Sequence, residues 1–143
     1  MKVLGCHHTG MTVRNLERSV AWYCDTFGFK ARPSFDAQGP GIEQIIGIPG
    51  VHIKGCHLEL GGYFLELIEY VTPPGKAMDL STSNVGSGHF AFVVDDIDQV
   101  YQNLKAKGVR FKGAPVQGRP GGPTACYFVD PDGIPLELVQ PPK

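Results

Sequence analysis

The hydrophobic pattern is clearest in residues 88–97, which alternate apolar side chains as a strand does and then present two aspartates. Apolar residues recur at helical spacing from Ile97 to Leu104, and the aspartates before them are suited to cap a helix. Gly108 follows, and glycine is the residue that most often ends a helix. The pattern therefore predicts a strand, a cap and a helix in this order.

The same order opens the chain. Residues 8–13 form a strand-like segment that leads through Asn15 into a helix predicted at 16–27. Each copy also ends alike, because the Leu-Glu-Leu pattern in residues 64–68 returns in residues 135–139. The chain is therefore a twofold internal repeat, which constrains the whole architecture.

The spacing of the repeat locates an insertion. His89 follows His8 by 81 residues, whereas Glu137 follows Glu66 by 71 residues. The first copy thus contains about ten additional residues, which we place in the glycine- and proline-rich region 39–50.

We interpret the chain as one domain of two modules, residues 1–71 and 88–143, joined by an aperiodic linker at residues 72–87. The remaining expected elements are strands at about 4–13, 30–35, 52–60, 63–71, 109–112, 124–129 and 134–139, with a long loop at 36–50 and a tight turn at 130–133.

Composition excludes several classes of partner. The net charge is −1, and the basic residues are dispersed, so neither nucleic acid nor an anionic membrane is an expected partner. No apolar run approaches the roughly 20 residues that span a bilayer, and no signal peptide is evident, so we expect a soluble cytoplasmic protein. The four cysteines lie far apart without a Cys-x-x-Cys pair, and we interpret them as buried thiols.

The candidate chemistry comes from counting strand faces. Glu66 and Glu137 each lie between two leucines, with apolar neighbours on their own face as well. An unpaired carboxylate is costly in such surroundings, so it must be protonated, paired or bound to a metal. His8 and His89 occupy repeat-related positions, and two histidines with two glutamates predict a metal site.

Alone, each of these residues has a plainer interpretation, as a core histidine or as an exposed glutamate of an edge strand. Their coincidence at repeat-equivalent positions favours the metal site, and the ligand types suit Zn, Ni, Fe, Co or Mn. We interpret His7, which should alternate away from His8, and also His52 and His57 as structural or surface residues.

The motifs in order resemble the vicinal oxygen chelate superfamily, which includes glyoxalase I, methylmalonyl-CoA epimerase, fosfomycin and bleomycin resistance proteins and extradiol dioxygenases. The resemblance rests on residues 8–13, 65–67, 88–96, 127–133 and 136–138. It covers essentially the whole chain and is specific to the superfamily rather than to one member.

This resemblance implies an α+β fold in which two βαβββ modules form a cupped, barrel-like mixed sheet around one divalent metal. Carried over by position, the metal ligands are His8, Glu66, His89 and Glu137. The complete ligand set is similar to that of glyoxalase I, whereas the epimerase usually has glutamine where this chain has Glu66. Modules of such proteins pair within a chain or across a dimer, and both arrangements stay open here.

We therefore expect a metal-dependent isomerase, epimerase or lyase of the glyoxalase I type. It would act on a small carbonyl or thioester substrate through an enediolate or enolate, with Glu137 or Glu66 as the base. The alternatives are an Fe- or Mn-dependent dioxygenase-like enzyme and a small-molecule-binding resistance protein. Glu43 loosely resembles a second base of the epimerase, but a surface role is the simpler interpretation. Unpaired module edges lead us to expect a homodimer.

Overall fold

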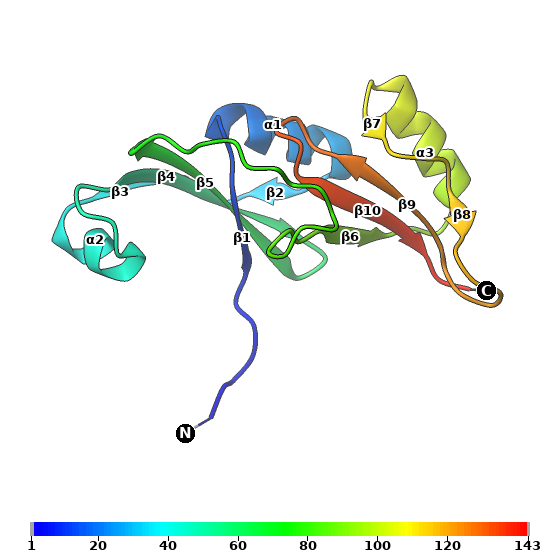
Figure 1. Ribbon diagram of the computed structural model, residues 1–143, viewed down its shortest axis with the longest axis horizontal. Coiled ribbons are helices and arrows are strands. Elements are labelled where there is room, and N and C mark those ends of the chain that lie inside the picture. The colour runs from blue at the N-terminus through cyan, green and yellow to red at the C-terminus, as the bar shows by residue number, and fades with distance from the viewer. Residues whose placement is uncertain (1, 143) are drawn as a thin grey trace. The chain divides into compact units, whose positions relative to one another are not determined.

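The computed structural model describes residues 2–142 and divides the chain into two compact units, Met1–Ala77 and Met78–Lys143 (Figure 1). We call them unit one and unit two. The division falls inside the segment expected to be a linker, and no helix or strand is present there between Thr72 and Phe90. That the two units together make one domain stays a prediction.

Both units contain the expected strand and helix followed by further strands. Unit one consists of β1 (Thr9–Thr12), α1 (Leu16–Phe27), β2 (Lys30–Ala31), β3 (Phe35–Gln38), α2 (Pro40–Ile46), β4 (His52–Leu60) and β5 (Tyr63–Thr72). Unit two consists of β6 (Phe90–Val93), α3 (Ile97–Ala106), β7 (Arg110–Phe111), β8 (Val116–Gln117), β9 (Thr124–Val129) and β10 (Pro135–Gln140).

Each unit folds its strands into one mixed sheet of the same topology. The order is β1-β5-β4-β2 in unit one and β6-β10-β9-β7 in unit two, and the first strand is parallel to the last in each. The short strands β2 and β3 both pair with β4, at Leu58–Glu59 and at His52–Gly55, so they follow one another along the same edge. β7 and β8 line β9 in the same way. Each unit is thus a βαβββ module, as expected, although its second strand is interrupted.

The helices begin and end where local signals predict. Asn15 accepts a hydrogen bond from the Arg18 backbone N–H at the start of α1, and Gly28 ends the helix with a left-handed backbone. In unit two, Asp96 caps α3 through the Gln99 backbone N–H. The side-chain caps satisfy backbone donors that have no partner inside the helix.

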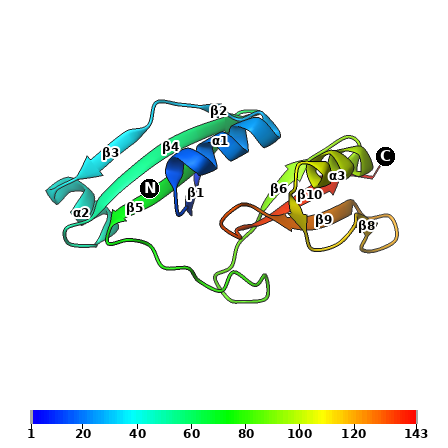
Figure 2. The same cartoon turned by 90° about the horizontal axis from the view of Figure 1, so that it is seen from above.

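One helix covers one face of each sheet (Figure 2). In unit one Tyr23 of α1 is completely buried, as are Leu65 and Leu67 of β5. In unit two Leu136 and Leu138 of β10 are buried in the same manner. Because successive strand residues point to opposite faces, Glu66 and Glu137 lie on the face away from this core.

The prediction of a loop at residues 36–50 was wrong, because this segment forms most of β3 and the whole of α2. Gly39 and Pro40 begin α2, and Gly47 ends it with a left-handed backbone. α2 has seven residues and none of them is buried, so it produces no periodic pattern that the sequence could reveal. It lies in the inferred insertion, since no helix lies between β8 and β9 in unit two.

The N-terminal strand is shorter than expected. β1 begins at Thr9 rather than near Leu4, so His8 precedes it directly, just as His89 precedes β6. His7 does not alternate away from His8, because strand alternation does not hold before the strand begins. The cysteine interpretation was half right, since Cys56 and Cys126 are buried but Cys6 is exposed and Cys24 is half-buried. Among the described residues, none of the helices has the length and apolar character needed to cross a membrane.

Candidate metal centre

The parallel pairing of β1 with β5 brings His8 and Glu66 together. Gly10 lies beside Glu66 in the register, and a glycine at this position leaves the carboxylate close to the β1 backbone. The His8 Nε2 atom is 3.1 Å from Glu66 Oε2. The Glu66 side chain is only 14% exposed, whereas that of His8 is 33% exposed. The pair thus has one sheltered carboxylate and one imidazole that is reachable from solvent.

Unit two repeats this geometry. Ala91 lies beside Glu137, at the position that Gly10 has beside Glu66. The His89 Nε2 atom is 3.1 Å from Glu137 Oε2, and the Glu137 side chain is 16% exposed. The repeat deduced from the sequence therefore extends to the register of the strands and to the histidine–glutamate contact.

Both pairs fit a divalent metal. Ligand atoms at about 2.1 Å from an ion are separated by about 3.0 Å when they subtend a right angle, close to the nitrogen–oxygen distances in both pairs. Imidazole and carboxylate are also the donors that Zn, Fe, Co, Ni and Mn accept. The two pairs belong to different units, so their meeting at one ion is part of the proposal below.

A further histidine beside Glu66 was missed by sequence reasoning. Antiparallel pairing of β4 with β5 places His57 directly opposite Glu66, and His57 Nε2 is 3.2 Å from Glu66 Oε1. The interpretation of His57 as structural or surface rested on the lack of a counterpart of His57 in module two. Its signal was available in the hairpin at Gly61–Gly62, because the register counted from this turn pairs position 57 with position 66.

His7 supports the same cluster. The Nδ1 atoms of His7 and His8 are 2.7 Å apart, so the two rings can share a hydrogen bond. This bond uses the ring nitrogen of His8 that does not contact Glu66. Histidine ligands of metals usually have such a partner on the second nitrogen, which orients the ring. His52, by contrast, contacts Asp36 at 2.7 Å and lies outside the cluster.

Tyr127 occupies in unit two the place that His57 has in unit one. It lies opposite Glu137, and its hydroxyl is 3.1 Å from His89 Nε2. Burial, and then the negative charge of Glu137, raise the pKa of the Tyr127 hydroxyl. Burial and the same charge raise the pKa of the neighbouring Cys126 thiol to about 11. Tyr127 is therefore a neutral donor and Cys126 a neutral thiol near pH 7.

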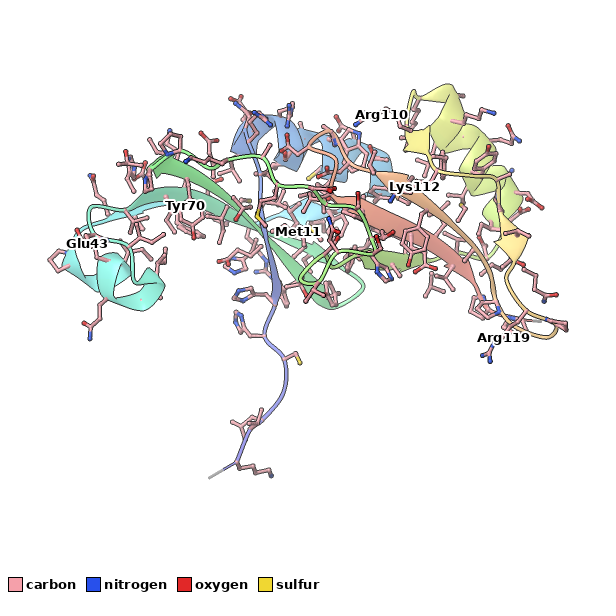
Figure 3. All side chains as sticks on the ribbon, in the orientation of Figure 1. Met11, Glu43, Tyr70, Arg110, Lys112 and Arg119 are labelled. Atoms are coloured by element: carbon pink, nitrogen blue, oxygen red, sulfur yellow. The ribbon has the colours of Figure 1, made fainter. Side chains whose placement is uncertain are left out.

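A hollow of about 420 Å³ opens on the same face of unit two as Glu137. Its lining residues are mostly apolar and come from β8, β9 and the loop between them: Val116, Gly118, Arg119, Pro123, Ala125 and Tyr127. Gly118 and Arg119 place the loop between β8 and β9 at the border of this hollow. The labelled Arg119 lies on this loop, apart from Arg110 and Lys112 (Figure 3).

Comparison with known proteins identifies the family to which this fold and these motifs belong. The family model of the Glyoxalase/Bleomycin resistance protein/Dioxygenase superfamily matches residues 5–138. The chain belongs to this superfamily. Both the resemblance of the motifs and the expected α+β fold of βαβββ modules are thereby confirmed.

Relatives of this glyoxalase-superfamily protein include proteins named as lactoylglutathione lyases. A probable lactoylglutathione lyase of Vibrio parahaemolyticus is 32% identical over 137 residues, which cover 93% of this chain and 88% of the relative. Lactoylglutathione lyase of Arabidopsis thaliana is 28% identical over 93% of this chain, but the match spans only 43% of that protein.

A solved structure shares the fold over the full length. A glyoxalase family protein from Bacillus cereus matches with a TM-score of 0.88, covering 100% of this chain and 97% of the other at 20% identity. At this identity the likeness concerns the fold of the superfamily protein and leaves its reaction open.

The structure also places Glu43, the other glutamate considered as a base. It lies half-buried on α2, at the far end of unit one from Met11 of β1 (Figure 3). Within unit one, the carboxylate that lies among histidines is thus that of Glu66.

Proposed function

We propose that this protein is a metal-dependent isomerase, epimerase or lyase of the glyoxalase I type. The observation that carries the proposal is the pair of repeat-related histidine–glutamate contacts, each with nitrogen and oxygen 3.1 Å apart. In the proposed centre, His8, Glu66, His89 and Glu137 hold one divalent ion, which is Zn, Ni, Fe, Co or Mn. The lyases named among the relatives support the reaction type.

The ion would supply positive charge where negative charge develops on a substrate oxygen as a proton leaves the adjacent carbon. The protein would orient a small carbonyl or thioester substrate between the carboxylates and an apolar surface that includes Phe64 and Ile68. Exclusion of water by such a surface strengthens the electrostatic interactions of the intermediate enediolate or enolate.

We assign the transfer of the proton to Glu137. Both oxygens of Glu66 contact histidines, His8 and His57, whereas among the described residues only one oxygen of Glu137 has a histidine contact. A carboxylate held on one side can turn toward the substrate with less loss of contacts. Glu137 would remove the proton from carbon, and Glu66 would serve mainly as a ligand.

The test is proton exchange at the substrate carbon. Full-length protein is depleted of metal with a chelator, reloaded separately with each of the five metals, and incubated in D₂O with 2-oxo, 2-hydroxy and acyl-thioester compounds. We expect deuterium to enter next to the carbonyl for a turned-over substrate, with about one ion bound per chain. Full activity in metal-free protein contradicts the proposal.

A ring-cleaving dioxygenase is the second candidate. The observation that favours it is the group of two histidines and one glutamate in unit one, because two histidines and a carboxylate are the ligands of many non-haem iron oxygenases. Oxygen consumption without deuterium entering at carbon, in the iron- or manganese-loaded protein, would establish this candidate instead.

We also propose that the protein is a homodimer whose partners are small-molecule substrates rather than nucleic acid or membranes. A protein that only sequesters a small molecule would not require four metal ligands. The lyase names of the relatives likewise favour an enzyme.

A further inference from the structure

Unit one contains more metal-binding donors than the repeat requires. His57 lies opposite Glu66, and its ring centroid is 5.3 Å from that of His8. One ligand atom from each of His7, His8 and His57 lies within 4.8 Å of the others. In unit two the equivalent register position is Tyr127. The histidine at position 57 is thus a departure from the repeat and needs its own explanation.

The environment of His57 Nε2 points to a missing partner. This atom is inaccessible to solvent, and among the described residues it has no hydrogen bond. It is 3.2 Å from Glu66 Oε1, but the two groups are not aligned for a hydrogen bond. A buried polar atom without a partner lowers stability, so native structures rarely keep one without reason. An ion between the imidazole and the carboxylate would be bound by the lone pair of His57 Nε2.

Neighbouring residues hold the His57 ring in this place. A Cβ atom on Gly55 would lie 2.2 Å from the Phe35 ring, so glycine is what allows Phe35 to lie on β4. The Phe35 ring centroid is 6.1 Å from that of His57, on the face that also carries Glu66. The imidazole is therefore oriented by packing before any ion binds.

We propose that His57 is a metal ligand and that unit one binds a divalent ion through His8, His57 and Glu66. This inference rests on the function proposed above, because the ion is the same one that His89 and Glu137 would complete. Two imidazoles and a carboxylate, from β4, β5 and the residue directly before β1, form a site that suits Co, Fe or Zn. Unit one then provides three of the five protein donors.

The test is Co²⁺ binding to chelator-treated full-length protein, followed by visible absorption. For His57→Ala we expect the dissociation constant to rise by about tenfold or more, with a changed cobalt spectrum. His57→Gln should show the same loss, because an amide can donate a hydrogen bond to Glu66 but is a poor ligand. The matched control is His52→Ala, on the same strand, which should bind as the unaltered protein does.

A measurement on the unaltered protein removes any dependence on how the variants fold. In the proton spectrum of the cobalt-loaded chain, each coordinated histidine contributes one strongly shifted, exchangeable imidazole N–H signal. We expect three such signals, from His8, His57 and His89. The signals are assigned through their nuclear Overhauser contacts, and the absence of a shifted signal from His57 would overturn its assignment as a ligand.

The remaining outcomes separate this inference from the proposed function. If His57→Gln restores normal affinity and spectrum, His57 only orients Glu66 and the ligand assignment is wrong. If His57→Ala binds normally while His8→Ala and Glu66→Ala bind weakly, the inference fails and the proposed metal centre stands. If none of the three alanine variants binds the metal more weakly, the proposed metal centre itself fails.

Discussion

At the scale of residues, the chemistry of this protein is concentrated in polar side chains that interrupt apolar strands. Glu66 and Glu137 each follow and precede a fully buried leucine, yet they themselves lie on the opposite, partly exposed face. Placing a carboxylate there is tolerable only with partners, and each has a histidine 3.1 Å away. The two glutamates are alike in position but differ in their second neighbours, which suggests different tasks.

Replacing Glu137 by Gln tests this division. The amide keeps the size and shape of the side chain, so we expect an unchanged fold but a turnover lowered by about a hundredfold or more, as for loss of a general base. Steady-state kinetics with the substrate identified by deuterium exchange would measure it, and circular dichroism would check the fold.

Glu43→Gln is the matched control for Glu137→Gln. Glu43 lies on α2, away from β1. We therefore expect the turnover of the Glu43→Gln variant to stay within about twofold of that of the unaltered protein, as for an ordinary surface change. Loss of turnover in the control as large as in Glu137→Gln would show that the base is assigned wrongly.

At the scale of elements, β4 is the strand on which unit one depends most. It pairs with β5 along its whole length and with both short strands on its other edge. It also brings His57 opposite Glu66 and, through Gly55, accepts the ring of Phe35. Changes in β4 should therefore affect both the stability of unit one and the candidate metal centre.

Gly55→Ala is the sharpest test at this scale. A methyl group would overlap the Phe35 ring, so we expect a loss of about 1–3 kcal/mol in the free energy of unfolding, as for overpacking. Urea denaturation followed by fluorescence measures the change. Combining it with Phe35→Leu should recover part of the loss, since the smaller side chain relieves the overlap.

The control for Gly55→Ala is Gly41→Ala. Gly41 lies in α2, and an added Cβ there meets no atom within 4 Å. Alanine is the better helix former, so stability should be unchanged or slightly higher. An equal loss in both variants would mean that the contact with Phe35 is not the cause.

At the scale of the whole molecule, each unit is a small sheet with open edges. In unit one β1 ends the sheet on one side, and in unit two β6 does so. Unpaired strand edges and half-exposed apolar side chains are commonly covered by a second copy of the chain. The symmetry of the repeat also suits such pairing, because one module can meet its equivalent in another chain.

We therefore expect a homodimer in solution. Sedimentation velocity at micromolar concentration should give a species of twice the chain mass of 15.5 kDa. Repeating the measurement on metal-depleted protein would show whether the ion contributes to assembly. A single species at the mass of one chain, with and without metal, would contradict this prediction.

Local sequence determined much of the fold. The limits of α1 follow from Asn15 and Gly28, because a side-chain cap and a left-handed glycine act within a few residues of the helix end. The hairpin at Gly61–Gly62 and the buried and exposed faces of β5 and β10 follow from similarly short-range patterns. Candidate ligands His8, Glu66, His89 and Glu137 were found because the repeat doubles each signal.

Only the tertiary structure revealed what depends on contacts between distant residues. The hairpin register that sets His57 beside Glu66 could be counted from the turn at Gly61–Gly62, but the arrival of His8 at the same carboxylate depends on the pairing of β1 with β5, which are distant in the sequence. His7 joins His8 because the strand begins after both of them. α2 has no buried face, so it lacks the periodic apolar pattern on which sequence reasoning relies. Short-range preferences thus determined the elements, whereas the neighbours of the carboxylates were decided by how the strands pair.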